Sequence, residues 1–359
     1  LEPVELPEGF LAMDNSSELA LKGRADGKPL IEAYDAIKFP RKEDISDLLN
    51  LFISSNKGLI ICGPQTDPRL ADAVGELARK LDYPVLCDVL SQVRGKNTLR
   101  KGGGHDLTVM EVDHYDAFLR DKNLTRRLVP ELVIRFGSLP VSKPLVQYLE
   151  QNRQSFQILI DESNGWRDPD RVISRVLHVD PISFCEVVND IISSYLAQWP
   201  GRDVLPRSGE WTRAWIRLGA IATQYVTETI DEFDTMFEGR IFPELLKLLP
   251  EESIVFAGNG MPVRDMDTFM SGARGYVVFK DGKRELIGID PTTRFLSNRG
   301  ASGIDGVISS ALGVSAGSGK RTILVIGDIS FFHDMNGLLA AKAHSPNCTI
   351  IVVNNDGGG

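Results

Sequence analysis

Short apolar runs alternate with amphipathic stretches along most of this chain. The runs at residues 57–62 (KGLIIC), 83–90, 131–136 (ELVIRF), 155–161 and 175–179 predict strands. Residues 68–81, 142–152 and 181–198 lie between or after these runs and carry apolar positions at the helical period. This alternation predicts a parallel sheet flanked by helices.

The second half of the chain repeats the pattern. Strands are predicted at 253–257, 322–330 (TILVIGDIS) and 348–355 (CTIIVVNN), and helices at 211–231 and 333–344. The fold class is therefore α/β, with two doubly wound parallel-sheet domains.

The domain organisation follows from breaks in this pattern. Residues 1–48 are Pro-dotted and charged, and read as a linker and entry segment that runs into the helical pattern of residues 42–55. Residues 49–199 form a central Rossmann-like domain. A Pro/Gly-containing stretch that begins at Pro200 marks the boundary to a second domain, residues 200–359.

Composition narrows the classes of function. A length of 359 residues suits two domains, and a net charge of −9 with a pI near 5.2 argues against a nucleic-acid partner. No apolar run is long enough to cross a membrane. The four scattered cysteines (Cys62, Cys87, Cys185 and Cys348) form no CxxC pair. They are typical of buried thiols in a reducing cytoplasm, where we expect the protein to be.

Polar groups stand where two neighbouring strands of the second domain end. Asp328 follows the run from residue 322, and Asn355 closes the run from residue 348. One helix between them makes the unit strand–helix–strand, so both side chains should lie at the same edge of the sheet, where ligands bind. Carboxylate, amide and free carbonyl oxygens, the last from residues 357–359, suit magnesium that also contacts a phosphate ester. The sequence therefore predicts a metal–diphosphate site.

This Gly327-Asp328 … Asn355 pattern resembles the signature of the thiamine diphosphate enzymes. Residues 327–338 (GDISFFHDMNGL) and 354–359 (NNDGGG) look like one branch of the family, the synthases of menaquinone biosynthesis. The resemblance implies thiamine diphosphate bound through Mg (or Mn), with Asp328, Asn355 and Gly357 as metal ligands. It also implies cofactor contacts from Gly327, Ile329 and Ser330.

Three further segments match the same family and supply candidate substrate residues. In residues 297–306, Ile304 would support the thiazolium ring and Arg299 would face the substrate. In residues 258–265, Arg264 would clamp a carboxylate, while Gly260 replaces a family serine. In residues 133–144, Lys143 would reach the substrate region, although a solvated residue in the first turn of a helix is a comparable interpretation. His333 is interpreted as a capping or packing group.

The central domain is expected to be a scaffold without dinucleotide. The sequence GPQTDP follows its first strand in place of GxGxxG, and residues 102–104 (GGG) are more typical of a loop than of a phosphate cradle.

The activity implied by the resemblance is decarboxylation of 2-oxoglutarate, followed by 1,4-addition of the succinyl carbanion equivalent to isochorismate. Family members also carry an N-terminal pyrimidine-binding domain with an activating glutamate, and they continue beyond the position of Gly359. We therefore expect this chain to be a piece that is inactive alone and that works in a homodimer or homotetramer, with the pyrimidine domain of a neighbouring subunit. Two alternatives stay open: an enzyme of the acetolactate synthase type, and a noncatalytic binding or scaffold module.

Overall fold

The computed structural model describes residues 22–34, 36–96, 110–199, 201–272, 275–278, 282 and 284–357. The chain divides into two units, Leu1–Ile37 and Lys38–Gly359. In the first unit, an ion pair of 2.8 Å joins Arg24 Nη2 and Asp26 Oδ2 beside a turn that Gly27 N closes onto Arg24 O. Every helix and strand named below belongs to the second unit. The sequence feature at residues 102–104 lies outside the described residues.

The middle domain is built on five parallel strands in the order β2-β1-β3-β4-β5. The strands are β1 (Gly58–Cys62), β2 (Val85–Cys87), β3 (Leu132–Phe136), β4 (Phe156–Ile160) and β5 (Arg175–Leu177). The strand predicted at 83–90 is shorter than expected. It ends at Cys87 because the Asp88 side chain accepts a hydrogen bond from Leu90 N and caps a short 3-10 turn, η1 (Val89–Ser91).

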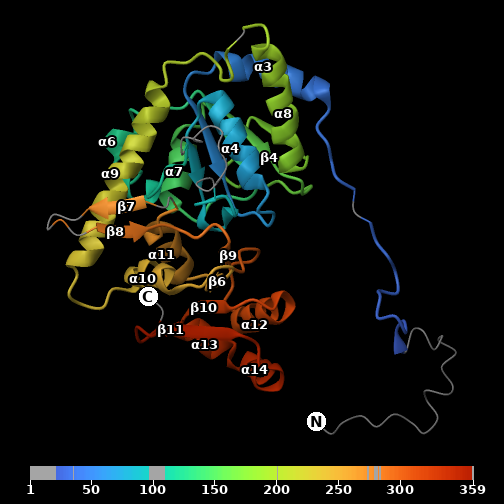
Figure 1. The fold of residues 1–359 in the computed structure, drawn as a ribbon, viewed down its shortest axis with the longest axis vertical. Coiled ribbons are helices and arrows are strands. Elements are labelled where there is room, and N and C mark those ends of the chain that lie inside the picture. Colours follow the sequence, from blue (N-terminus) through green and yellow to red (C-terminus); the bar gives the residue numbers. More distant parts are fainter. Residues whose placement is uncertain are drawn as a thin grey trace. The chain divides into compact units, whose positions relative to one another are not determined.

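Helices cover both faces of this sheet (Figure 1). On one face, strand residues such as Ile60 and Ile134 pack against α3 (Lys42–Ser54), α4 (Leu70–Leu81) and α8 (Pro181–Leu196). On the other face, Leu59, Ile61 and Val133 pack against α5 (Tyr115–Phe118), α7 (Lys143–Gln151) and α9 (Glu210–Glu232). The short helix α6 (Lys122–Thr125) lies between α5 and β3 in the chain.

Helix α9 belongs to the core of the middle domain, whereas the sequence pattern placed it at the start of the second domain. Trp215 is fully buried against Tyr148, and Trp211 Nε1 donates to Gly58 O at 2.7 Å. Likewise, α3 buries Ile45 beneath the sheet, although residues 42–48 fall in the predicted entry segment. The domain boundaries themselves stay a prediction.

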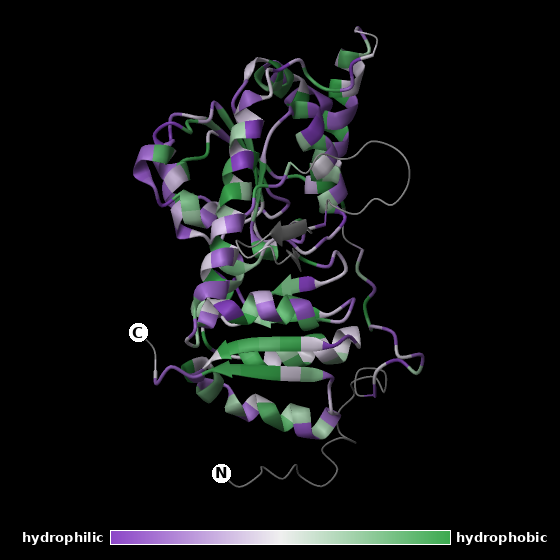
Figure 2. Ribbon diagram, turned by 60° about the vertical axis from the view of Figure 1, so that its left-hand side comes forward, coloured by the Kyte–Doolittle hydropathy of each residue, from purple (hydrophilic) through white to green (hydrophobic). Residues whose placement is uncertain are grey.

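The second domain has four parallel strands in the order β11-β10-β6-β9 and a separate antiparallel hairpin. The strands are β6 (Ile254–Ala257), β9 (Arg294–Leu296), β10 (Thr322–Gly327) and β11 (Cys348–Val353), and the hairpin is β7 (Gly275–Val278) with β8 (Arg284–Ile287). One sheet face packs against α10 (Ile241–Leu248) and α11 (Met261–Phe269), the other against α12 (Val307–Ser318) and α14 (Leu338–His344). Figure 2 shows β10 and β11 apolar along most of their length. Strand β10 is buried, as an inner strand of a parallel sheet requires, whereas β11 lies at the edge of the sheet and its residues are partly buried or exposed. The α/β class with two parallel-sheet domains is confirmed.

The segment around Asp328 differs from the prediction in two ways. The strand ends at Gly327, and Asp328 begins a short helix, α13 (Asp328–His333). The single helix predicted over 333–344 is divided into α13, the 3-10 turn η3 (Met335–Gly337) and α14. The break occurs because Asp334 turns inward to bond to Ser309 of α12, and because the backbone at Gly337 comes so close that an added Cβ would meet Ser309 Oγ at 2.6 Å.

All four cysteines are free thiols, three of them buried, and Cys348 is half-buried. Among the described residues, none of the helices is both long and apolar enough to cross a membrane.

Candidate functional site

Two of the predicted metal ligands, Asp328 and Gly357, are in contact in the structure. Strands β10 and β11 pair in parallel with Gly327 opposite Val353, so the segments that follow them leave the sheet side by side. Asp328 Oδ2 accepts a hydrogen bond of 2.9 Å from Gly357 N, and Oδ1 accepts one of 2.8 Å from Ile329 N. Gly357 has φ +113°, which favours glycine at this turn. Gly358 and Gly359 lie outside the described residues.

Asn355 lies in the same loop and is exposed. Its Nδ2 donates to Glu238 Oε1 at 3.1 Å, which orients the side chain by its nitrogen and leaves the amide oxygen for a ligand. One carboxylate, one amide oxygen and one backbone carbonyl make a hard, weakly charged donor set. Such a set suits a magnesium ion that completes its coordination with phosphate oxygens. The residues present therefore fit the metal and the diphosphate.

A buried asparagine joins the two glycine-rich segments. Asn259 Nδ2 donates to Gly303 O at 2.6 Å, and its Oδ1 accepts from Ser297 Oγ at 3.0 Å. The turn that precedes α11 and the loop that carries Arg299 and Ile304 are thereby held against each other. Ile304 follows Gly303 directly and is half-buried.

Asp334 has the capping role that the sequence interpretation gave to His333. Its carboxylate accepts from Ser309 N at 2.8 Å and from Ser309 Oγ at 3.1 Å, in the first turn of α12. His333 Nδ1 lies 3.2 Å from Asp305 Oδ1 in an exposed pair. Of the two neighbouring α13 residues, Ile329 is exposed and Ser330 is buried.

A cavity of about 850 Å³ contains Lys143 and Arg264 together; we call it the Arg264 cavity. Residues of α5 to α7 form one side and residues of α11 the other, so the cavity lies between the two domains. Within the described part of the chain, neither Lys143 nor Arg264 has a side-chain hydrogen bond or an ion pair, and both are exposed. Arg120 and Lys122 add further positive charge to the lining.

Asp265 is an acidic residue of the same lining that sequence reasoning did not single out. Burial, and then the charge of Glu238, raises the pKa of Asp265 to about 6. Glu238 is also the partner of Asn355, so the acid stands next to the group that orients a predicted metal ligand. The position of Asp265 directly after Arg264 is the sequence feature from which it could have been identified, whereas Glu238 belongs to no recognisable motif.

Arg299 lines a second cavity of about 730 Å³, which we call the Arg299 cavity. Burial lowers the pKa of its guanidinium; Asp88 acts against this shift, and the like charge of Arg264 adds to it. Arg299 therefore lines a different cavity from Lys143 and Arg264. The two arginines are nevertheless close enough for their charges to interact.

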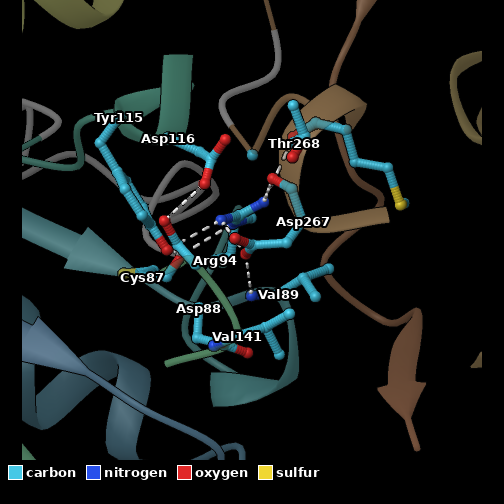
Figure 3. Close-up of polar contacts among 12 residues, drawn as sticks. Cys87, Asp88, Val89, Arg94, Tyr115, Asp116, Val141, Asp267 and Thr268 are labelled. Atoms are coloured by element: carbon cyan, nitrogen blue, oxygen red, sulfur yellow. Dashed lines mark hydrogen bonds and ion pairs between the residues drawn. The ribbon is translucent and has the colours of Figure 1, made fainter. Parts of the chain in front are cut away.

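The position of α11 is fixed by a buried polar junction between the domains (Figure 3). Arg94 follows η1 of the middle domain, and its Nη2 lies 2.6 Å from Asp267 Oδ1 of α11. Arg94 also donates to Cys87 O at 2.8 Å and to Asp267 O at 2.7 Å. Val89 N donates to Asp267 Oδ1, and His114 Nδ1 is 2.9 Å from Thr268 O. The helix that carries Arg264 is thus anchored in the middle domain.

Two family models match the chain. Residues 32–257 match the middle domain of thiamine pyrophosphate, and residues 283–359 match the C-terminal TPP binding domain of thiamine pyrophosphate enzymes. This chain belongs to the thiamine pyrophosphate enzyme family. Asp328 and Asn355 lie inside the match to the TPP-binding domain, Lys143 lies inside the middle-domain match, and Arg264 lies between the two.

Curated relatives within the thiamine pyrophosphate enzymes share one name, 2-succinyl-5-enolpyruvyl-6-hydroxy-3-cyclohexene-1-carboxylate (SEPHCHC) synthase. The protein of Geobacillus kaustophilus is 42% identical over 320 residues, 89% of this chain and 49% of its own length. That of Geobacillus thermodenitrificans is 41% identical over 319 residues, 88% of this chain and 48% of its own. That of Listeria monocytogenes is 37% identical over 306 residues, 85% and 47%. The chain spans about half the length of these relatives.

The thiamine pyrophosphate enzyme fold is also found among solved structures. An X-ray structure of a Mycobacterium smegmatis protein described as thiamin diphosphate-dependent aligns with a TM-score of 0.57 at 15% identity, over 92% of this chain and 56% of the other. At this identity the likeness supports the fold alone.

Proposed function

We propose that the whole protein is a magnesium- and thiamine diphosphate-dependent SEPHCHC synthase. It would decarboxylate 2-oxoglutarate and add the remaining four-carbon unit to isochorismate. The names of the relatives at 37–42% identity support this activity. The observation that carries it is the Arg264 cavity, which presents Lys143 and Arg264 without ion-pair partners in the described part of the chain.

The charges of the substrates explain why such cations are needed. Both 2-oxoglutarate and isochorismate are dicarboxylates, whereas the chain as a whole carries a net charge of −9. Positive charge must therefore be concentrated locally. A guanidinium already paired with a carboxylate would have to lose that partner before binding substrate, whereas Lys143, Arg264 and Arg299 would not. Arg264 offers the two-pronged geometry that matches a carboxylate.

The cofactor would be held where β10 and β11 end. Asp328 Oδ1 or Oδ2, Asn355 Oδ1 and the carbonyl of Gly357 would bind Mg²⁺, or Mn²⁺, which accepts the same oxygen ligands. Ile304 would support the cofactor ring. When bound, thiamine diphosphate supplies the carbanion and the electron sink for decarboxylation. The chain's own residues bind and orient the two acids, and Asp265 offers a carboxyl group that exchanges a proton near neutral pH.

Isothermal titration of thiamine diphosphate with MgCl₂ into this chain tests the cofactor site. Asp328→Asn keeps the size of the side chain and removes the ligand charge, so we expect binding to be lost. Asp356→Asn is the matched control, because it removes a neighbouring exposed charge from the same loop without touching a proposed ligand. Equal affinities in the two variants would contradict the assignment.

A product assay on the whole protein separates the synthase from an enzyme of the acetolactate synthase type. We expect turnover with 2-oxoglutarate plus isochorismate and little with pyruvate. We further propose a cytoplasmic homodimer or homotetramer in which a neighbouring subunit's pyrimidine domain completes the site. Sedimentation of the whole protein as a monomer during turnover would refute that arrangement.

A further inference from the structure

Lys143 occupies a helix position that does not favour a cation. It is the first residue of α7, and the positive end of the helix dipole disfavours positive charge in the first turn. Its side chain is exposed, lines the Arg264 cavity, and among the described residues has no hydrogen bond or ion pair. The position of the ammonium group therefore depends on how firmly the start of α7 is held.

Ser142, the residue before Lys143, caps α7. Its Oγ accepts from Leu145 N at 3.3 Å and donates to Asp116 Oδ1 of α5 at 2.6 Å. A hydroxyl group has one hydrogen, so donation to Asp116 turns the lone pairs of Oγ toward Leu145 N. The other carboxylate oxygen, Asp116 Oδ2, accepts from Arg120 Nη2 at 2.6 Å. The buried carboxylate of Asp116 therefore fixes the cap, and its negative charge offsets the cost of a lysine at this end of α7.

A second buried carboxylate holds the backbone just before the cap. Asp88 Oδ2 accepts from Val141 N, and its Oδ1 accepts from Leu90 N at 2.7 Å (Figure 3). Asp88 is fully buried and directly follows β2, whereas Val141 lies two residues before Lys143. The chain that leads into α7 is thus fixed to the middle sheet.

The residues around α5 also contact α11, the helix that carries Arg264. His114 directly precedes α5, and its Nδ1 lies 2.9 Å from Thr268 O. Because a carbonyl oxygen only accepts, this contact needs the hydrogen on Nδ1. Burial lowers the pKa of His114, which keeps the ring neutral in that tautomer near neutral pH. Residues 114 and 116 therefore hold α11 and the start of α7 at once, which sets the position of Lys143 relative to Arg264.

We propose that Ser142 and Asp116 are positioning residues for the synthase reaction, which hold Lys143 where its ammonium group meets a carboxylate of an acid substrate. This inference rests on the proposed function and deepens it. Ser142 and Asp116 act through Lys143 and need not touch the substrate. Loss of the cap would let the first turn of α7 fray, so the ammonium group would bind the acid less tightly in the ground state and in the transition state alike. The expected result is a higher KM with little change in kcat.

Steady-state kinetics of the whole protein test the proposal. Ser142→Ala should raise KM about fivefold, since a hydrogen bond to a charged group is weakened but not abolished. The rise should affect the same acid, 2-oxoglutarate or isochorismate, whose KM rises in Lys143→Met. Ser142→Thr keeps the hydroxyl group and is also a favoured cap, so its KM should be close to that of the parent. In the Lys143→Met background, Ser142→Ala should cause no further rise, because the side chain through which it acts is already absent.

Asp180→Ala is the matched control. Asp180 caps α8, which likewise has a proline in its first turn, by accepting from Ser183 N at 2.7 Å. Helix α8 packs on the other face of the middle sheet from α5 and α7, and Asp180 does not line the Arg264 cavity. Ser142→Ala and Asp180→Ala should both lower the midpoint of thermal unfolding, whereas only Ser142→Ala should change KM.

Several outcomes would overturn the proposal. The same KM increase from Ser142→Ala with and without Lys143 would show that Ser142 does not act through Lys143. An unchanged KM in Ser142→Ala or in Lys143→Met would also contradict it, and an equal increase in Asp180→Ala would assign the effect to a general loss of stability. A parent protein without turnover of the two acids would refute the proposed synthase function and with it the role given to Lys143, so the two kinds of failure are distinguishable.

Discussion

Arg94→Met should uncouple the two domains of the chain. The Arg94 and Asp267 side chains are 3% and 2% exposed, and their charged atoms approach to 2.6 Å. Methionine keeps much of the apolar stem of arginine but donates no hydrogen bond. The change would leave Asp267 buried with only the donor Val89 N, and would leave the carbonyls of Cys87 and Asp267 without the bonds that Arg94 donates.

The expected loss of stability is about 4 kcal/mol, because removing one partner of a buried ion pair costs about 3–5 kcal/mol. Burial already raises the pKa of Asp267, and loss of the guanidinium would raise it further, so the variant should take up a proton near neutral pH. That proton limits the cost, and the variant should therefore lose less stability at pH 6 than at pH 8. Adding Asp267→Leu should recover part of the loss, since no charge then stays buried.

Urea unfolding with two probes measures the effect. All four tryptophans (Trp166, Trp199, Trp211 and Trp215) lie in the segment that packs on or follows the middle sheet, so their fluorescence reports the middle domain. Far-ultraviolet circular dichroism reports both domains. In the parent chain the two transitions should coincide, whereas in Arg94→Met the dichroism transition should begin at lower urea as the second domain unfolds first.

Arg120→Met is the matched control. Its guanidinium lies 2.6 Å from Asp116 but is 65% exposed, so its loss should cost less than about 1 kcal/mol. A loss below about 1 kcal/mol in Arg94→Met, with coincident transitions, would refute the interpretation of this junction as the main coupling between the domains.

Other variants test separate parts of the structure. Burial, and then the charge of Asp113, raises the pKa of Glu111 to about 8. The protonated carboxyl group therefore stabilises the fold fully below about pH 4.5, and this contribution is lost as the pH rises to 8. At about 1.4 kcal/mol per pH unit, the loss is at most about 5 kcal/mol. Glu111→Gln should remove this part of the pH dependence of the thermal unfolding temperature. Asp334→Ala should lower stability by about 1 kcal/mol in chemical denaturation through loss of the α12 cap, and Asp334→Asn should lose less. In Gly260→Ser the added Cβ meets no atom closer than 3.9 Å, so the fold should persist and 2-oxoglutarate affinity should rise up to about fivefold through one hydrogen bond. Arg299→Ala should raise the KM for the acids with little change in kcat; a change confined to kcat would contradict a ground-state binding role.

Local patterns predicted the elements that bear the proposed metal site. The runs ending near residues 328 and 355 are apolar enough to be buried strands, and parallel strands joined by a helix must end at one edge. The structure places Asp328 against Gly357 as this requires. The strand end was less predictable, because the apolar Ile329 follows Gly327 and Asp328 closely in sequence, although the structure already begins α13 at Asp328.

No local sequence pattern predicted the contacts between distant segments. Arg94 and Asp267 are 173 positions apart, and neither lies in a pattern that distinguishes a buried charge from a surface one. The sequence did not predict the packing of α9 on the middle sheet for a related reason. The amphipathic period of α9 indicates that one face of the helix is buried, but it does not indicate which sheet that face packs against. Only packing around Trp215 settles this.

The sequence by itself determined the α/β class and the alternation of strands and helices, and it predicted oxygen ligands at one sheet edge, because these features depend on periodicity and on the residues that end each strand. The tertiary structure alone decided that Lys143 meets Arg264 in one cavity while Arg299 lines another, and that α11 is anchored by Arg94. The physical reason is that burial, charge pairing and cavities arise where segments far apart in the chain pack together, and no local pattern encodes which segments those are.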